Sequence, residues 1–271
     1  MKRTETRALF VGNVQIGGQN KCVLQSMTNV PAKDVERSVA QINELAENGC
    51  ELVRTAVLDE EDARAIPAIK ARINIPLIAD IHFNYLLALI CLDGGIDAIR
   101  INPGNIGSRK NTEAVVAKCK EKNVPIRIGI NAGSLERELL EKYGGPCAEA
   151  LVESAQRHVD ILESMDFYDI CLSFKSSNVE LTIDAYELAA KTFNYPLHLG
   201  VTEAGGFADS AVKSSAALGV LLHEGIGDTI RISVSGPPKD ELIIGKALLR
   251  SFRLIEDVPD LVACPTWKNS I

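Results

Sequence analysis

Strand-like and helix-like segments alternate along this chain, and this alternation constrains the fold more than any other feature. Eight short apolar runs have the length and composition of buried strands, at 22–27, 52–57, 76–81, 98–102, 125–131, 169–174, 196–201 and 229–234. A segment with helical periodicity follows each run, at 34–48, 60–72, 85–94, 109–122, 147–165, 179–193, 210–225 and 239–252. The sequence therefore predicts an α/β fold, a (β/α)8 TIM barrel, with an additional short helix at 134–143.

A doubly wound open sheet is the alternative architecture. The count of eight βα units argues against it, as does the lack of a Gly-x-Gly-x-x-Gly fingerprint after the first strand. Ahead of that strand, residues 8–18 read ALFVGNVQIGG, two short apolar runs around Gly12-Asn13. This pattern predicts an N-terminal β-hairpin that closes the bottom of the barrel. We expect the barrel domain to span residues 1–255.

Composition excludes several classes of function. The formal net charge of −7 disfavours a nucleic-acid surface. The N-terminus has no apolar run long enough for a signal peptide, and no window approaches the roughly 18 apolar residues of a membrane helix. We therefore expect a cytoplasmic protein without membrane contact. Six of the seven cysteines, which are Cys22, Cys50, Cys91, Cys119, Cys147 and Cys171, lack metal-type spacing and read as small buried hydrophobes.

Polar side chains gather where the predicted strands end, which is the end of a barrel that carries chemistry. They are Arg54, Asp80, His82, Arg100, Asn102, Arg127, Asn131, Lys175, His198, Thr202, Glu203, Arg231 and Ser233. The set holds four arginines and one lysine, and we expect Asp80 and Glu203 to be the opposing acids. Guanidinium groups match phosphate oxygens two at a time, so the pattern favours a small ligand with a diphosphate. Structural salt bridges are the alternative for each arginine.

Three of these residues have more specific interpretations. We expect His82 to hydrogen-bond the substrate, although Asp80-x-His82 could also form half of a metal site that lacks a third ligand at matching spacing. Glu203 is the candidate catalytic residue, as an acid/base or as a partner of a substrate hydroxyl. A salt bridge to a neighbouring arginine is the alternative for Glu203.

The chain carries, in this order, the motifs VGNVQIGG, VLQSMTN, ADIHF, RINPGNIG, RIGINAGSLE, HLGVTEAGG and EGIGDTIRIS, and the resemblance that they support runs from about residue 6 to residue 266. The chain thereby resembles the 4-hydroxy-3-methylbut-2-enyl diphosphate synthases of the non-mevalonate isoprenoid pathway. The resemblance implies a barrel that binds 2-C-methyl-D-erythritol 2,4-cyclodiphosphate for a two-electron reductive ring opening. It also implies a [4Fe-4S] cluster in a second domain, a flavodoxin or ferredoxin as electron donor, and a homodimer. By this resemblance Arg54, Arg100, Arg127, Lys175 and Ser233 bind the diphosphate.

The chain departs from this family near its end. The family has Cys-Pro-Thr-Cys, whereas this chain has Cys264-Pro265-Thr266 followed by Trp267. The resemblance makes Cys264 a metal ligand and residues 256–271 the truncated start of the iron–sulfur domain, as a fragmentary gene or an incomplete sequence would produce. Because a cluster usually needs four ligands, we expect the chain alone to be inactive in reduction. The alternatives are a stand-alone diphosphate-binding barrel and a pterin-type transferase barrel.

Overall fold

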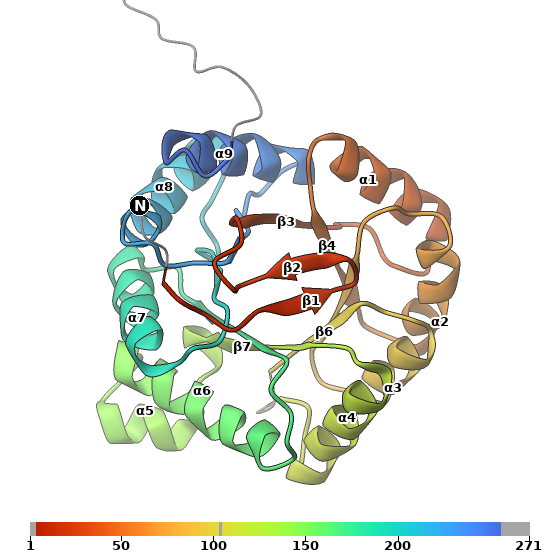
Figure 1. The fold of residues 1–271 in the computed structure, drawn as a ribbon, viewed down its shortest axis with the longest axis horizontal. Coiled ribbons are helices and arrows are strands. Elements are labelled where there is room, and N and C mark those ends of the chain that lie inside the picture. The colour runs from red at the N-terminus through yellow and green to blue at the C-terminus, as the bar shows by residue number, and fades with distance from the viewer. Residues whose placement is uncertain (1–3, 103–104, 256–271) are drawn as a thin grey trace, which may run out of the picture.

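A computed structural model describes residues 4–102 and 105–255, and these form the predicted barrel. Figure 1 shows helices in a ring around the central strands. One parallel sheet has the order β8-β7-β6-β5-β4-β3-β10-β9. Its strands are β3 (Val23–Met27), β4 (Leu52–Val57), β5 (Leu77–Ile81), β6 (Ala98–Ile101), β7 (Ile126–Asn131), β8 (Ile170–Lys175), β9 (His198–Leu199) and β10 (Thr229–Ile230). A parallel bridge between Leu172 and Leu197 links the two ends of this order, so the sheet nearly closes.

The helices cover the outside of the sheet through apolar faces. In α1, Val39, Ile42 and Leu45 are buried at helical spacing, and the Asp34 side chain caps the helix by accepting from the Arg37 N–H. The helices are α1 (Val35–Glu47), α2 (Glu60–Lys70), α3 (Tyr85–Asp93), α4 (Arg109–Lys122), α5 (Arg137–Tyr143), α6 (Ala148–Glu163), α7 (Val179–Thr192), α8 (Phe207–His223) and α9 (Pro238–Ser251), with a 3-10 turn at Ala132–Ser134.

Some boundaries differ from the sequence expectation. Helix α8 begins at Phe207 rather than at 210. The sequence pattern misses this first turn because residues 207–209 are exposed and carry no apolar periodicity. Strands β9 and β10 are shorter than predicted. The regular hydrogen-bond ladder ends at residues 199 and 230, but residues 201 and 232 are still buried. The apolar pattern in the sequence therefore extends beyond the strands.

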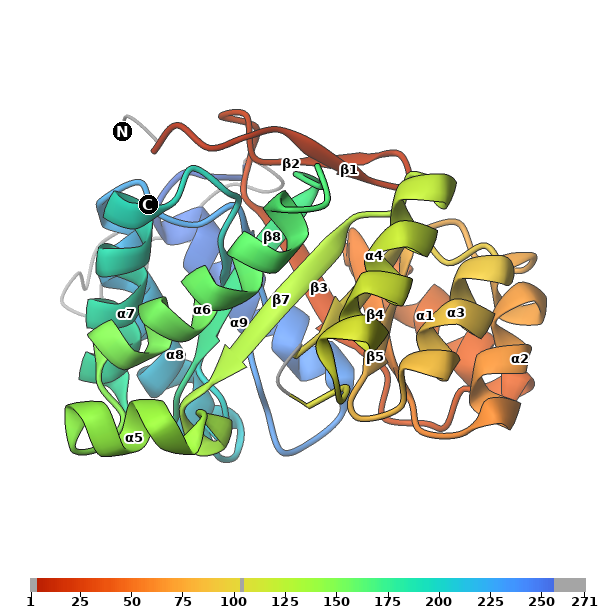
Figure 2. The same cartoon turned by 90° about the horizontal axis from the view of Figure 1, so that it is seen from below.

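The predicted hairpin is confirmed as β1 (Leu9–Val11) and β2 (Val14–Ile16), which pair antiparallel. Leu9, Val11 and Ile16 pack on a buried cluster of residues that begin the barrel strands, including Val23, Leu52, Ile78 and Ala98. In Figure 2 the hairpin lies across one end of the barrel, and the β7 arrow points to the other end. The hairpin therefore closes the amino end and leaves the carboxyl end for a site.

Among the described residues, no helix is both long enough and apolar enough to cross a lipid bilayer.

Candidate active site

A cavity of about 260 Å³ opens among the carboxyl ends of the strands. The residues that line it are Met27, Arg54, Asp80, His82, Arg100, Asn131, Ser173, Lys175, Val201, Thr202, Arg231 and Ser233. Strand alternation explains this lining, since Arg100 faces the barrel interior while Ile99 and Ile101 are buried in the core cluster that includes the helices. The structure thus brings most of the predicted residues together and adds Met27, Ser173 and Val201.

Asp80 is the carboxylate at the centre of this cavity. Its Oδ2 lies 3.4 Å from Arg54 Nε, and its Oδ1 lies 3.1 Å from Arg100 Nη1 and 3.5 Å from His82 Nε2. Burial opposes ionisation of Asp80, but Arg54, His82 and Arg100 outweigh this effect and hold the pKa of its carboxyl well below the usual range. Asp80 is therefore a buried anion that holds two arginines in place.

Arg231 has its own carboxylate, which comes from a helix. Its Nη2 donates to Glu241 Oε1 at 2.6 Å and its Nε donates to Glu241 Oε2 at 3.2 Å. Ser26 Oγ also donates to Glu241, at 2.7 Å. The expectation that Asp80 and Glu203 are the opposing acids therefore needs correction, because Glu241 in the first turn of α9 supplies the second buried carboxylate. An acid in a first helical turn is common for electrostatic reasons, so its sequence position does not reveal its burial.

Lys175 is the least compensated cation of the cavity. Burial lowers the pKa of its ammonium group well below the usual value, and Arg127, Arg54, Arg231 and Arg100 lower it further by repulsion. Among the described residues, no carboxylate lies within salt-bridge distance of Lys175. An anion that enters the cavity would supply the missing negative charge.

Arg127 lies deeper in the barrel than the sequence suggested, and it is not part of the cavity lining. It is 5% exposed, and its Nη1 donates to Gln25 Oε1 at 2.9 Å. Burial lowers the pKa of Arg127 to about 10. Gln25 is a polar residue at an inward-facing position of β3. This signal in the sequence could have identified it as a hydrogen-bond partner of Arg127. Arg127 thus adds positive charge beneath the cavity.

The remaining predicted residues surround the site at different depths. His198 is fully buried, with Nδ1 2.5 Å from Thr229 Oγ1, and burial lowers the pKa of its imidazole so that the ring is neutral. Asn102 is buried, and its Nδ2 donates to Ser134 Oγ at 3.5 Å. Neither residue is part of the cavity lining.

Two further predicted residues are Glu203, which the structure describes, and Cys264, which it does not. Glu203 is exposed, has a φ of 53° and directly follows the lining residue Thr202. The glutamate is not itself part of the lining. Cys264 and the rest of residues 256–271 lie outside the described residues.

The described residues do not form a cluster site. Residues 4–102 and 105–255 contain no group of three or more His, Cys, Asp or Glu side chains arranged to hold a metal. Their free cysteines are dispersed, and five of the six are buried. The Asp80–His82 pair likewise gains no third ligand there. A [4Fe-4S] cluster does not fit this part of the chain.

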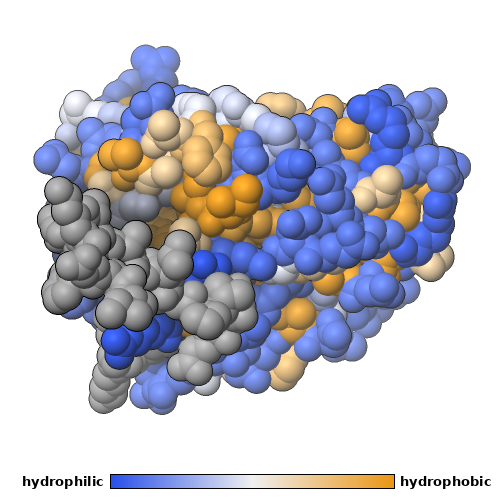
Figure 3. All heavy atoms as spheres, turned by 90° about the horizontal axis from the view of Figure 1, so that it is seen from above, coloured by the Kyte–Doolittle hydropathy of each residue, from blue (hydrophilic) through white to orange (hydrophobic). Residues whose placement is uncertain are grey.

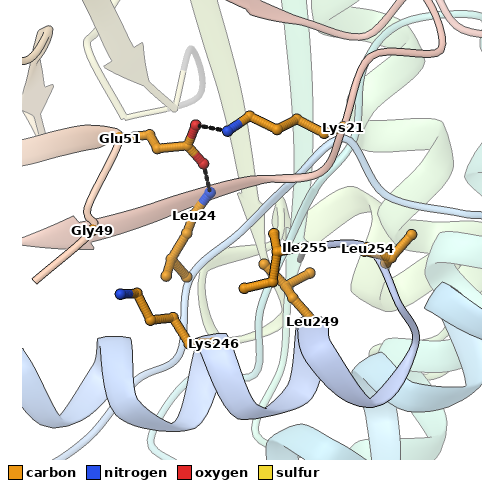
Figure 4. Close-up of a pocket in the computed structure, with 8 residues that line it drawn as sticks. All are labelled: Lys21, Leu24, Gly49, Glu51, Lys246, Leu249, Leu254 and Ile255. Carbon is orange, nitrogen blue, oxygen red and sulfur yellow. Dashed lines mark hydrogen bonds and ion pairs between the residues drawn. The ribbon is translucent and has the colours of Figure 1, made fainter. Parts of the chain in front are cut away.

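A second, larger hollow of about 460 Å³ lies elsewhere, between α9 and the amino ends of β3 and β4. Figure 3 shows apolar side chains gathered on the α9 side of the molecule. In Figure 4, Leu24, Leu249, Leu254 and Ile255 form the apolar lining, and Glu51 pairs with Lys21 at the edge. It is larger than the cationic cavity, but the charged residues of its lining are only Lys21, Lys246 and Glu51, and Glu51 already pairs with Lys21.

Comparison with known proteins separates the possible families. A family profile described as the GcpE TIM-barrel domain matches residues 6–246. The 4-hydroxy-3-methylbut-2-en-1-yl diphosphate synthase (flavodoxin) of Clostridium perfringens is 57% identical over 266 residues, which cover 98% of this chain and 76% of that protein. The enzyme of the same name from Bacillus licheniformis is 57% identical over 97% of this chain and 71% of its own length. The chain belongs to the GcpE family.

The part matched by the GcpE profile contains the whole cationic cavity, because it spans all eight barrel strands. The chain corresponds to the N-terminal, barrel part of these GcpE relatives, which are oxidoreductases by name.

Solved structures of other families share the fold. Dihydropteroate synthase from Yersinia pestis has a TM-score of 0.62 at 12% identity and covers 91% of this chain and 98% of its own. A truncated 3-deoxy-D-arabino-heptulosonate 7-phosphate synthase from Thermotoga maritima has a TM-score of 0.61 at 14% identity and covers 92% and 91%. At such identities the likeness shows the barrel alone, and it gives no support to a pterin-type transferase.

Proposed function

We propose that the cationic cavity binds the diphosphate of 2-C-methyl-D-erythritol 2,4-cyclodiphosphate, for reductive ring opening to 4-hydroxy-3-methylbut-2-enyl diphosphate. The observation that carries the proposal is the charge of the site. Arg54, Arg100, Lys175 and Arg231 line one cavity, Arg127 lies beneath it, and only Asp80 and Glu241 oppose them among the described residues. A doubly charged ligand would offset this excess, and charge-assisted hydrogen bonds to phosphate are short and strong.

The lining suggests how the substrate is held. In this proposal Lys175, Ser233 and the arginines of the lining bind the phosphate oxygens, while Asn131 and Thr202 offer neutral hydrogen bonds to the rest of the molecule. His82 is only partly exposed beside Asp80, and we assign it a hydrogen bond to the substrate. Glu203, next to Thr202 at the rim, is the proposed acid/base. Asn102 and His198 support the walls.

The electrons must come from outside this cavity, because its described residues carry no redox group. We propose a [4Fe-4S] cluster as the family cofactor, with Cys264 as one ligand, flavodoxin or ferredoxin as the donor, and a homodimer as the acting form. The names of the curated relatives support flavodoxin. The barrel's own part in this proposal is to bind and orient the cyclic diphosphate.

Charge reversal at Arg100 tests the proposal. We expect Arg100→Glu to abolish binding of the cyclodiphosphate in calorimetry, because it places a second carboxylate beside Asp80. Arg72→Glu is the matched control, since Arg72 is exposed after α2, pairs with Glu36 and does not line the cavity. The control should retain the affinity of the unsubstituted chain. Equal affinity in Arg100→Glu, or binding of a pterin in place of the cyclodiphosphate, would refute the proposed function.

A further inference from the structure

Gly129 occupies a position in β7 where glycine is unexpected. It lies between Ile128 and Ile130 in the strand interior, where a missing side chain lowers stability. Its φ is not in the left-handed region, so the backbone conformation does not require glycine. Glycine inside a strand often marks the close approach of another group.

The group that approaches Gly129 is the guanidinium of Arg100. A Cβ atom built on Gly129 would lie 2.5 Å from Arg100 Nη2 and 2.8 Å from Cζ, and Arg100 Nε would also overlap it. The three nearest heavy atoms all belong to this one side chain. The room that a side chain of β7 would fill is therefore filled by Arg100 of β6.

Arg100 is held on both sides in this position. Its Nη2 donates to the Gly129 carbonyl oxygen at 3.3 Å, and its Nη1 donates to Asp80 Oδ1 at 3.1 Å. The guanidinium therefore spans from β5 to β7 while the side chain lines the cavity. A methyl group on residue 129 would push the guanidinium away from both contacts.

We propose that Gly129 is a positioning residue for anion binding, because its missing side chain lets Arg100 lie across β7 at the cavity wall. This inference rests on the proposed function and goes beyond it, since Gly129 itself offers no side chain to the ligand. Gly200 is the comparison, because a side chain there would meet backbone as well as another side chain. A Cβ there would meet Lys175, but it would also lie 2.7 Å from the backbone oxygen of Arg231.

A double-mutant cycle tests the coupling without any ligand. We expect Gly129→Ala to lower the Tm of the 271-residue chain by roughly 4–10 °C, because the added methyl overlaps the guanidinium. In the Arg100→Ala background the same change should leave the Tm unchanged or raise it, since the room is then empty. Gly200→Ala, whose obstacle includes backbone, should still lower the Tm in that background.

The cycle is then repeated with the cyclodiphosphate in calorimetry. Gly129→Ala should weaken binding by about tenfold or more, and it should cause no further loss once Arg100 is alanine. A Tm loss of equal size in both backgrounds would overturn the proposal, as would unchanged Tm and affinity in Gly129→Ala. If Gly129→Ala does not fold, folding of the double variant supports the proposal and its failure to fold contradicts it. Absence of binding by the unsubstituted chain would instead refute the proposed function, and the Tm cycle would still decide the role of Gly129.

Discussion

Asp80 is the residue on which the stability of the unliganded cavity depends most directly. It is 3% exposed and contacts Arg54 and Arg100, two cations that would otherwise be buried without compensation. Breaking a buried ion pair from one side is costly because the remaining charge has lost both water and its partner. The cavity is thus stable only while a small number of carboxylates offset its cations.

Asp80→Asn should therefore lower the free energy of unfolding by about 3–5 kcal/mol, measured by urea denaturation at neutral pH. The cyclodiphosphate should recover part of this loss, because it supplies negative charge to the same arginines. Asp93→Asn is the control, since Asp93 is exposed and pairs with Lys118 at the surface. A neutral-pH stability equal to that of the control would contradict this account.

The stability that Asp80 contributes should also depend on pH. The pKa of Asp80 is lowered in the folded state, so its contribution to the free energy of unfolding is complete above the unfolded-state pKa of about 4. This contribution disappears as the pH falls below that value.

The lowered pKa of Lys175 predicts that ligand binding is coupled to uptake of a proton. Burial and the charges of Arg127, Arg54, Arg231 and Arg100 lower its pKa, so the folded state binds this proton less tightly than the unfolded state does. Stability attributable to Lys175 should consequently rise with pH toward the unfolded pKa of about 10.4. A bound dianion favours the charged ammonium, so binding should take up protons.

Calorimetry of cyclodiphosphate binding in buffers of different ionisation enthalpy measures this uptake. Ring closure leaves each phosphorus with one strongly acidic oxygen, so the ligand itself does not titrate near neutrality. We expect net proton uptake in the unsubstituted chain, together with tighter binding as the pH falls. Lys175→Met should reduce the uptake and weaken binding. Uptake of the same size in Lys175→Met would exclude this lysine as its source.

At the level of elements, the hairpin and the cavity have separate tasks at opposite ends of the barrel. Leu9 and Phe10 are neighbours in β1, but Leu9 is 4% exposed and Phe10 is 58% exposed. Leu9→Ala should cost about 2–4 kcal/mol of stability because it leaves a void against the strand starts, and Phe10→Ala should cost far less. Both variants should bind the cyclodiphosphate with unchanged affinity. A loss of affinity in Leu9→Ala at a temperature where it is folded would show that the two ends are coupled.

The elements were largely predictable from sequence, while contacts between them were not. Apolar periodicity located the helices, because this signal is local. The pairing of Arg231 with Glu241 depends on how α9 packs on β3, and no local pattern encodes it. The depth of Arg127 likewise depends on the tilt and register of the closed barrel. Strand alternation predicted which face it occupies but not how far it lies from the mouth.

For the whole molecule, the proposed function assigns anion binding and redox chemistry to different parts. The described cysteines are dispersed, and Trp267 stands where the resemblance places a second cluster cysteine. Anaerobic reconstitution of the 271-residue polypeptide with iron and sulfide should therefore give no stable [4Fe-4S] absorption, while cyclodiphosphate binding persists. Cys264→Ser should behave identically in this polypeptide. A stoichiometric cluster that Cys264→Ser abolishes would contradict the expectation.

A crystal structure of the chain with 2-C-methyl-D-erythritol 2,4-cyclodiphosphate would show whether the cations at the carboxyl end of the barrel bind a diphosphate. We expect both phosphorus atoms in the cavity among Arg54, Arg100, Lys175 and Arg231, with Asp80 still between its two arginines. Density for the ligand in the apolar hollow beside α9, or cations that remain in contact only with protein groups while the ligand lies elsewhere, would contradict the account.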